Sequence, residues 1–464
     1  MNEHLELRAQ LLFDTPRDGF REAMASFRER LADESMAASP ERRARIAEIV
    51  ADLAIDLGSY LVHWHLSPGG GVPRAGPALP REAIDEERVR LLALLEAWDR
   101  HDLEGAVEVE VASIAGSNLR RLSELADAGE VDSRWGHDAA SGLTWAVRRG
   151  AVLVTTNPVM VNMVRKDDPT AWDPVRDALK TSHPKATPQQ RASLMTMNVV
   201  LDECRELRPI WRVTDGRYGC VSLQIDPRAY DDAGRMVEEV QDLFGRLERE
   251  LGGTPNTRFK IPGTMAGLEA VRRLTSQGIG VTVTVNASVD QQLAFAEVIE
   301  QGSAPLSLLV LMMGRLDDPV RGELEAAGVP NATEVSRWAS VAVMRRAYPL
   351  LFAERGYRRS AILAASMRGP WSIDGAIVSG PSEVFITCFP DKAREYDEVR
   401  RPILSRIDEP VPAETISTLS HSLTFLQAYT VGALEVAAFD SFVPVVETLG
   451  QFSRNYDEFL AYNG

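Results

Sequence analysis

The chain has 464 residues, a hydrophobic content of 45% and a formal net charge of −16. These values are typical of a soluble globular protein with one large domain and appendages, or with two to three domains. The negative charge disfavours a surface that tracks nucleic-acid phosphates or binds an anionic membrane, so we expect small molecules or other protein chains as partners.

The cysteines and the start of the chain indicate a cytoplasmic protein. Cys204, Cys220 and Cys388 are odd in number and widely separated, which favours reduced thiols over a disulfide framework and implies no metal. Residues 1–19 are charged and lack the plan of a signal peptide, and no apolar run is long enough to span a bilayer.

Residues 1–128 carry the pattern of amphipathic helices. Apolar residues recur at helical spacing over residues 46–57, and the pattern resumes after a break at Val89. Between these helices, residues 67–80 (SPGGGVPRAGPALP) are so rich in glycine and proline that we expect a flexible loop. The sequence therefore predicts a helical N-terminal region whose role stays open.

Residues 129–395 change to short β-branched runs that alternate with longer helical stretches, the plainest helix covering residues 231–250. The expected strands are Trp135–Asp138, Val152–Thr156, Val221–Ile225, Phe259–Ile261, Val281–Val285, Leu308–Met312, Ile362–Ala365 and Val384–Ile386. Continuous apolar strands separated by helices indicate parallel pairing with both faces of the sheet covered. Eight of them favour a (β/α)8 barrel, and no GxGxxG motif follows the first strands to suggest a dinucleotide fold.

Residues 396–464 return to helical spacing, which predicts helices over 416–439 and 442–462. We expect this tail to pack on the barrel or to form a dimer contact. The fold class predicted for the whole chain is α/β, a (β/α)8 barrel with an α-helical N-terminal extension and a helical C-terminal tail.

Lys260 is the most informative residue at the predicted strand ends, where the chemistry of such a barrel lies. Of the 51 basic residues only five are lysine, and Lys260 alone lies inside an apolar run, Phe259 to Ile261, followed by a turn and the helical pattern 265–276. A desolvated lysine can lose its proton, and the neutral amine can attack a ketone to form a Schiff base. The alternative is a lysine that extends to solvent or pairs with a carboxylate.

Other polar residues close the neighbouring strands and form a candidate pocket. They are Thr155, Thr156, Asn157, Ser222, Gln224, Asp226, Thr282, Thr284, Asn286, Ser288, Arg315, Ser366 and Arg368. Two arginines at the same height on adjacent strands are suited to clamp a phosphate, because each offers a planar fork of donors. Taken singly, each arginine also fits a surface ion pair, and Asn157 before a proline fits a helix cap.

These segments resemble the transaldolase family of class I Schiff-base aldolases. The resemblance extends in the family's order over about residues 130–395, and the helical regions on either side have no counterpart in compact transaldolases. The matching segments are Val154–Pro158, Val221–Pro227, Phe259–Thr264, Thr282–Ser288, Gly314–Asp317 and Ala365–Arg368.

The resemblance implies a role for each matching residue. Lys260 forms the Schiff base, and burial together with Arg315 and Arg368 would lower its pKa. Asp138 moves the hydroxyl proton during carbon–carbon cleavage, with Asp132 as a rival for that role. Thr284 helps to hold the catalytic water. Asn157 would bind the sugar part of the substrate, and Arg315, Ser366 and Arg368 would bind its phosphate. Further candidates for substrate binding at the strand ends are Thr156, Ser222 and Thr282.

Departures from the family pattern point away from a housekeeping transaldolase of the pentose phosphate pathway. Gln224, a candidate catalytic residue, stands where typical transaldolases have a glutamate and fructose-6-phosphate aldolases have a glutamine. An amide can position a water but cannot exchange a proton with it near neutral pH. Thr282 replaces an asparagine, and Val310 and Met312 replace a serine and an aromatic residue. The pocket would be more apolar than in the family.

The function expected from these residues is cleavage or transfer of a three-carbon ketol unit of a sugar or sugar phosphate, with no cofactor and no metal. The alternatives are an aldolase without transfer, similar to fructose-6-phosphate aldolases, a different Schiff-base lyase, and a barrel that binds a sugar phosphate without turnover. A homo-oligomer stays open.

Overall fold

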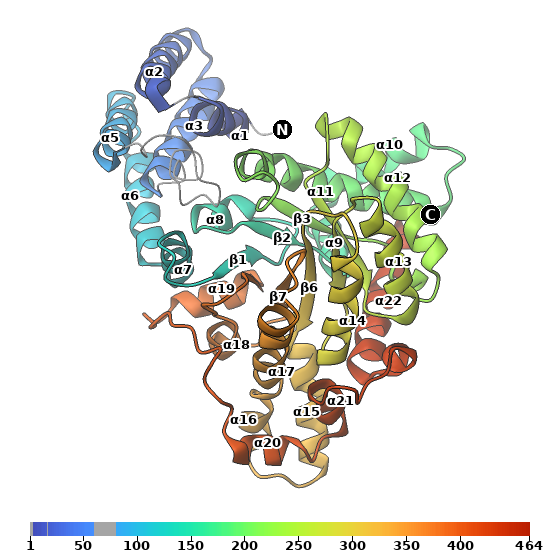
Figure 1. Cartoon of the computed structure of the whole chain (residues 1–464). Helices are drawn as coiled ribbons and strands as arrows, with labels where there is room; N and C mark the ends of the chain where they lie inside the picture. Colours follow the sequence, from blue (N-terminus) through green and yellow to red (C-terminus); the bar gives the residue numbers. More distant parts are fainter. Residues whose placement is uncertain (1–2, 16, 60–79) are drawn as a thin grey trace.

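The computed structural model describes residues 3–15, 17–59 and 80–464. The loop predicted at 67–80 therefore lies, except for Pro80, outside the described residues. Figure 1 shows a barrel covered by helices, with the N-terminal helices gathered at one edge of it.

Eight parallel strands close into one barrel in sequential order, with β8 paired to both β7 and β1. The predicted (β/α)8 barrel is confirmed, because each expected apolar run coincides with a strand. The strands are β1 (Ser133–His137), β2 (Leu153–Thr155), β3 (Cys220–Gln224), β4 (Thr257–Pro262), β5 (Val281–Thr284), β6 (Ser307–Met312), β7 (Ser360–Ala365) and β8 (Val384–Cys388).

The helices between the strands cover the outside of the barrel (Figure 1). The helix predicted over 231–250 is α12 and the helical pattern at 265–276 is α13, whose hydroxyl cap is Thr264. The covering helices are α8 (Leu143–Arg148), α9 (Pro158–Asp167), α10 (Pro169–Ser182), α11 (Pro188–Val213), α12 (Ala233–Leu251), α13 (Met265–Ser276), α14 (Val289–Glu300), α15 (Met313–Ala326), α16 (Ala332–Ser336), α17 (Ala339–Tyr348), α18 (Pro370–Gly375) and α19 (Pro390–Asp397).

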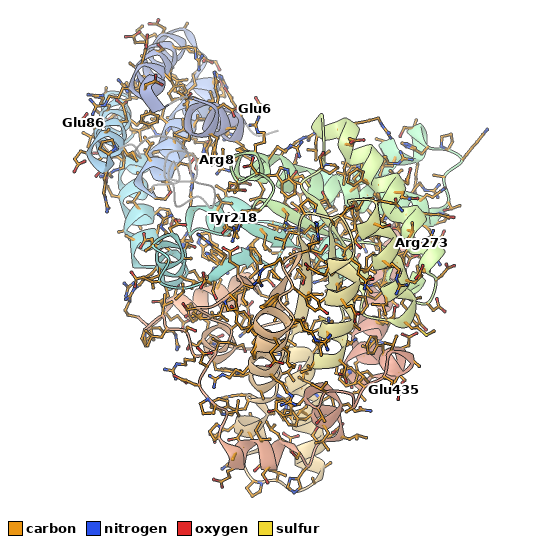
Figure 2. The ribbon with its side chains drawn as sticks, in the orientation of Figure 1. Glu6, Arg8, Glu86, Tyr218, Arg273 and Glu435 are labelled. Atoms are coloured by element: carbon orange, nitrogen blue, oxygen red, sulfur yellow. The ribbon has the colours of Figure 1, made fainter. Side chains whose placement is uncertain are left out.

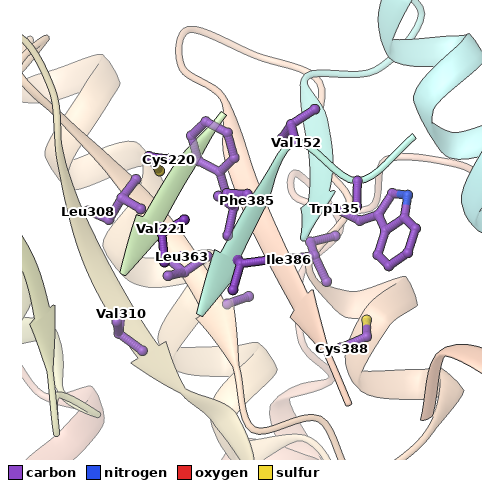
Figure 3. Packing of buried hydrophobic residues seen from close by; sticks show 14 of the residues in the cluster. Trp135, Val152, Cys220, Val221, Leu308, Val310, Leu363, Phe385, Ile386 and Cys388 are labelled. Atoms are coloured by element: carbon purple, nitrogen blue, oxygen red, sulfur yellow. The ribbon is translucent and has the colours of Figure 1, made fainter. Parts of the chain in front are cut away.

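The strands are apolar on both faces because helices cover one face and the barrel interior the other. Figure 3 shows Val221, Leu308, Leu363 and Phe385 among the buried side chains that pack around the strands. All five residues of β3 are buried, as are all five of β8. Continuous burial of this kind explains why the strands read as unbroken apolar runs.

The N-terminal region is helical, as the spacing predicts. The apolar residues over 46–57 are buried in α3 except for the partly buried Ile55. Val89 in α5 is 57% exposed, so the predicted register is wrong at that residue. The side of α5 that faces the core presents Ile84, Leu91 and Leu95. The helices are α1 (Glu3–Arg8), α2 (Phe20–Ala37), α3 (Pro40–Gly58), α5 (Arg81–Ala97), α6 (His101–Gly116) and α7 (Asn118–Asp127).

Buried ion pairs join the N-terminal helices to the barrel. Asp56 accepts one hydrogen bond from Arg148 Nε on α8 at 2.8 Å, and its other carboxylate oxygen lies 2.7 Å from His4 Nε2. Arg8 pairs with Glu206 on α11 at 2.9 Å, and Figure 2 shows Arg8 between the N-terminal helices and the barrel. Burial opposes the charge on Asp56, but Arg148 and His4 outweigh it and hold its pKa below the usual range.

The tail contains α20 (Ala413–Leu419), α21 (Leu423–Tyr429), a 3-10 turn at Val436–Ser441 and α22 (Val443–Asn463). The single helix predicted over 416–439 is therefore wrong, although α22 matches its prediction. Ser422 breaks the pattern because its hydroxyl accepts the Phe425 N–H at 3.0 Å and starts α21. Gly432 then turns the chain with a φ of 82°. Helix α22 packs against α9, α11 and α15 on the barrel.

No helix in the described part of the chain is long and apolar enough to cross a membrane. The three cysteines are buried and free.

Candidate active site

Lys260 lies on β4 between two strands whose polar residues align with it. In the barrel register it is the partner of Gln224 on β3 and of Thr282 on β5. All three side chains are at least nine-tenths buried. Asp138 follows the last residue of β1, and its N–H donates to the Cys388 carbonyl of β8 at 2.9 Å. The four residues therefore belong to the carboxyl end of the barrel, where the chemistry of this architecture takes place.

The Lys260 amine and the Asp138 carboxyl group shift each other's titration. Burial lowers the pKa of Lys260, while the charge of Asp138 acts in the opposite direction. Burial also raises the pKa of Asp138, against the effects of Lys260, Thr155 and His137. The expected contribution of Arg315 and Arg368 to the Lys260 pKa is wrong, because burial is the cause that lowers it. The amine makes no hydrogen bond to any residue that the structure describes.

The rival aspartate, Asp132, lies at the other end of β1. Its carboxylate accepts the Gly380 N–H at 2.8 Å, and it lines a cavity at the amino end of the barrel with Ser360. Asp132 and Lys260 therefore lie at opposite ends of the barrel. The geometry favours Asp138 as the partner of the amine.

Thr155 lies at the predicted end of a strand, and the structure gives it a place in the site. Its hydroxyl donates to Asp138 Oδ1 at 2.6 Å, and both residues are buried. The signal was present in the strand register, because Val154 on β2 pairs with His137 on β1 and each is followed by one of these two residues. This hydrogen bond fixes the orientation of the Asp138 carboxyl group.

The other predicted substrate-binding residues near β2, β3 and β5 already have partners. The Ser222 and Thr282 hydroxyls lie 2.8 Å apart, and Thr156 donates to the Ser222 carbonyl at 3.0 Å. Asn157 caps α9, with Oδ1 accepting the N–H groups of Val159 and Met160. The Asn157 side chain thus performs the capping role given as the alternative, and its amide nitrogen remains for a ligand.

Two further buried residues have side-chain groups whose hydrogen-bonding capacity is not fully used. Gln224 is 6% exposed, and its Oε1 has no partner within the described ranges. Thr284 is also buried, and among the described residues its hydroxyl donates only to the Met312 sulfur, at 3.9 Å, which is a weak acceptor. A water or a substrate hydroxyl can satisfy both groups.

Arg315, Arg368 and Ser366 come together at the ends of β6 and β7. Arg315 lies in the first turn of α15, three positions beyond the end of β6, so the predicted strand end is displaced. Arg368 donates to the Ser366 hydroxyl at 3.1 Å and to Asp318 at 2.6 Å. Burial lowers the pKa of Arg315, and the nearby charge of Arg368 lowers it further. Two guanidinium groups this close favour an anion between them.

The C-terminal helix reaches this arginine pair. Arg315 Nη2 donates to the Gln451 side chain of α22, and Arg315 Nε is buried without a partner among the described residues. No local sequence pattern indicates this contact, because 136 positions separate the two residues.

Two residues at the carboxyl end of the barrel have a left-handed backbone conformation. Val285 follows β5 with a φ of 55°, and Ser366 follows β7 with a φ of 63°. A left-handed conformation is costly for a β-branched residue such as valine, and such strain concentrates at functional sites.

The fold is a closed (β/α)8 barrel of eight parallel strands, and an amine and a carboxyl group are buried at its carboxyl end, as an enzyme of the aldolase class requires. Residues 144–422 match the family described as Transaldolase/Fructose-6-phosphate aldolase. The chain belongs to this family. The match begins after Asp138, so the placement of that residue rests on its geometry.

Similar proteins carry the name transaldolase. The chain is 30% identical over 255 residues to the transaldolase of Parafrankia sp. (strain EAN1pec), covering 52% of this chain and 67% of that protein. It is 29% identical over 228 residues to the transaldolase of Thiobacillus denitrificans (strain ATCC 25259 / T1), covering 47% of this chain and 60% of that protein. The chain thus spans about two thirds or less of these relatives. Family and relatives together support an enzyme of the transaldolase or aldolase type.

Proposed function

We propose that this chain cleaves or transfers a three-carbon ketol unit of a sugar or sugar phosphate through a Schiff base on Lys260. The observation that carries the proposal is the buried Lys260 amine, which has no hydrogen-bond partner in the described structure and interacts electrostatically with Asp138. Burial that lowers the pKa of an amine increases the fraction of its nucleophilic, neutral form.

The reaction begins with attack of the Lys260 amine on the ketose carbonyl at C2, and loss of water gives a protonated imine. Asp138 takes the proton of the C4 hydroxyl, the C3–C4 bond breaks, and its electron pair moves into the imine to give an enamine. An aldehyde leaves. A general base of this kind contributes about a hundred- to ten-thousand-fold to the rate.

The enamine has two fates, and they separate transfer from simple cleavage. Its C3 either attacks an acceptor aldehyde or takes up a proton, and hydrolysis of the resulting imine then frees Lys260. Gln224 can orient a water but cannot supply a proton to it. This amide, in place of the family's glutamate, supports the second candidate function, an aldolase without transfer.

The substrate phosphate would lie between Arg315 and Arg368. Arg315 Nε, which has no partner in the described ranges, offers one donor. Arg368 keeps its contact with Ser366, and Asp318 neutralises part of its charge. Arginine suits this role because its planar fork binds two phosphate oxygens at once.

Borohydride trapping tests the proposal. Fructose 6-phosphate, sedoheptulose 7-phosphate and dihydroxyacetone are each added with borohydride, and the adduct is located by intact mass and peptide mapping, with Lys260→Met as the control. We expect a three-carbon adduct on Lys260 from at least one sugar phosphate. An adduct from dihydroxyacetone alone would mean a different natural donor, and no adduct on folded protein would leave a barrel that binds sugar phosphates without turnover.

A further inference from the structure

A second cavity opens at the amino end of the barrel, opposite the candidate active site. Its volume is about 350 Å³, and it lies beside the starts of β4, β5 and β6 and under α11 and α12. The residues that matter for its chemistry are Arg208, Trp211, Arg212, Phe244, Arg258 and Leu306.

Arg258 gives this cavity a buried positive charge. It is 2% exposed, and its guanidinium donates to the Cys220 sulfur at 2.5 Å, the Gly216 carbonyl at 3.2 Å and the Leu306 carbonyl at 3.2 Å. All three acceptors are neutral, and no carboxylate in the described part of the chain forms an ion pair with Arg258. Buried charges in proteins are normally paired, so an unpaired guanidinium beside a cavity calls for an anion.

Arg208 adds a second guanidinium without a carboxylate. It donates to the Thr254 carbonyl at 2.5 Å and forms no ion pair with any described residue. Burial lowers its pKa, and Arg212, one helical turn further along α11, lowers it again. Arg212 is itself paired with Asp14 at 2.9 Å at the surface. Among the described residues that line the cavity, the only carboxylate is that of the exposed Asp215, so positive charge is in excess.

Aromatic and aliphatic side chains form the remaining wall. Trp211, Phe244, Pro255 and Leu306 line the cavity, and the Arg258 guanidinium lies 5.9 Å from the centre of the Trp211 ring. An apolar wall beside a group of donors is the usual composition of a small-molecule site. The wall would bury a flat apolar body while the arginines bind its charged end.

We propose that the amino end of the barrel holds a second binding site for a small organic anion, a phosphate or carboxylate attached to a flat apolar group, bound by Arg258 and Arg208 against Trp211. The site is separate from Lys260 and requires none of the chemistry proposed for it.

Phenyl phosphate is a suitable probe, with inorganic phosphate and phenol as its two halves. Binding is measured by isothermal titration calorimetry at low salt on the Arg315→Leu, Arg368→Leu double variant, which lacks the guanidinium groups of the candidate active site. We expect one phenyl phosphate per chain, bound more tightly than either half.

Substitutions at the cavity decide the result. Arg258→Gln and Arg208→Gln should each weaken phenyl phosphate binding at least about tenfold, as expected for loss of a charge-assisted contact. Arg205→Gln is the matched control, because Arg205 lies on the same helix but pairs with Asp202 at 3.1 Å. Thermal melting establishes that each variant is folded. If Arg258→Gln unfolds, binding of phenyl phosphate by Arg208→Gln tests the proposal, because Arg208 is only half-buried. No binding at millimolar probe, or equal binding by the Arg208 variant and the control, would overturn the proposal.

Discussion

Asp132 and Asp138 flank β1 and lie at opposite ends of the barrel. At the amino end, the Asp132 carboxylate accepts a hydrogen bond from the Gly380 N–H. At the carboxyl end, Asp138 lies near Lys260 and accepts a hydrogen bond from the Thr155 hydroxyl. The two aspartates thus have different environments at the two ends of the same strand. This pair provides a matched control for the proposed proton transfer.

Asp138→Asn should lower the rate of carbon–carbon cleavage about a hundred- to ten-thousand-fold, because an amide cannot take the hydroxyl proton. Asp132→Asn should leave the rate within a few-fold of the wild type. Borohydride trapping of dihydroxyacetone on Lys260 should survive in both variants, since imine formation does not require cleavage. Equal loss of cleavage in the two variants would remove the role assigned to Asp138.

The pKa of Lys260 leads to a prediction for both reactivity and stability. Burial lowers it below 10.5, so the rate of trapping with dihydroxyacetone should rise with pH through an apparent pKa below that value. A folded-state pKa below the unfolded one means that the unfolded chain binds more protons between the two values, and stability falls as pH falls through this window. Lys260→Met should therefore gain stability over the wild type as pH is lowered, by chemical denaturation. A constant difference between the two proteins across this window would contradict a depressed pKa.

The sequence revealed the strands and Lys260 because their signals are local. A strand buried on both faces reads as an unbroken apolar run, and a rare lysine within such a run stands out. The contacts that orient the site are not local. Thr155 meets Asp138 through strand register, and Gln451 reaches Arg315 across 136 positions, so neither pair has a pattern along the chain. The helix predicted over 416–439 was wrong because the helical periodicity of the apolar residues continues past Ser422, whereas the Ser422 side chain caps a new helix at that point.

Gly314 is required by the position of Arg368. A Cβ added at Gly314 would lie 2.5 Å from Arg368 Cζ and 2.5 Å from the Ser366 carbonyl oxygen. Gly314→Ala should therefore displace Arg368 and raise KM for phosphorylated sugars about tenfold, as loss of a charge-assisted contact predicts. Trapping of dihydroxyacetone, which has no phosphate, should change little. Steady-state kinetics with both classes of substrate separates these effects.

Gly322→Ala is the control for Gly314→Ala. Gly322 lies on the same helix, α15, and a Cβ added there meets nothing within 4 Å. The substitution should leave KM unchanged and stabilise the fold by up to about 1 kcal/mol through helix propensity. A similar rise of KM in both variants would place the effect in the helix and not in the arginine pair.

Asp317 should make the stability of the fold depend on pH near neutrality. Burial raises its pKa to about 7, against hydrogen bonds that its carboxylate accepts from the Ser340 N–H at 2.9 Å and the Ser340 hydroxyl at 3.1 Å. Because the folded-state pKa exceeds the unfolded value, the folded chain binds more protons between pH 3.8 and about 7, and stability is lost as pH rises through that range. The Asp317→Asn variant carries no charge at this position. As pH rises through this interval, its free energy of unfolding should increase relative to that of the wild type by at most about 4 kcal/mol. Urea denaturation of both proteins at several pH values measures the gain, and parallel stability curves would show that Asp317 ionises normally in the folded protein.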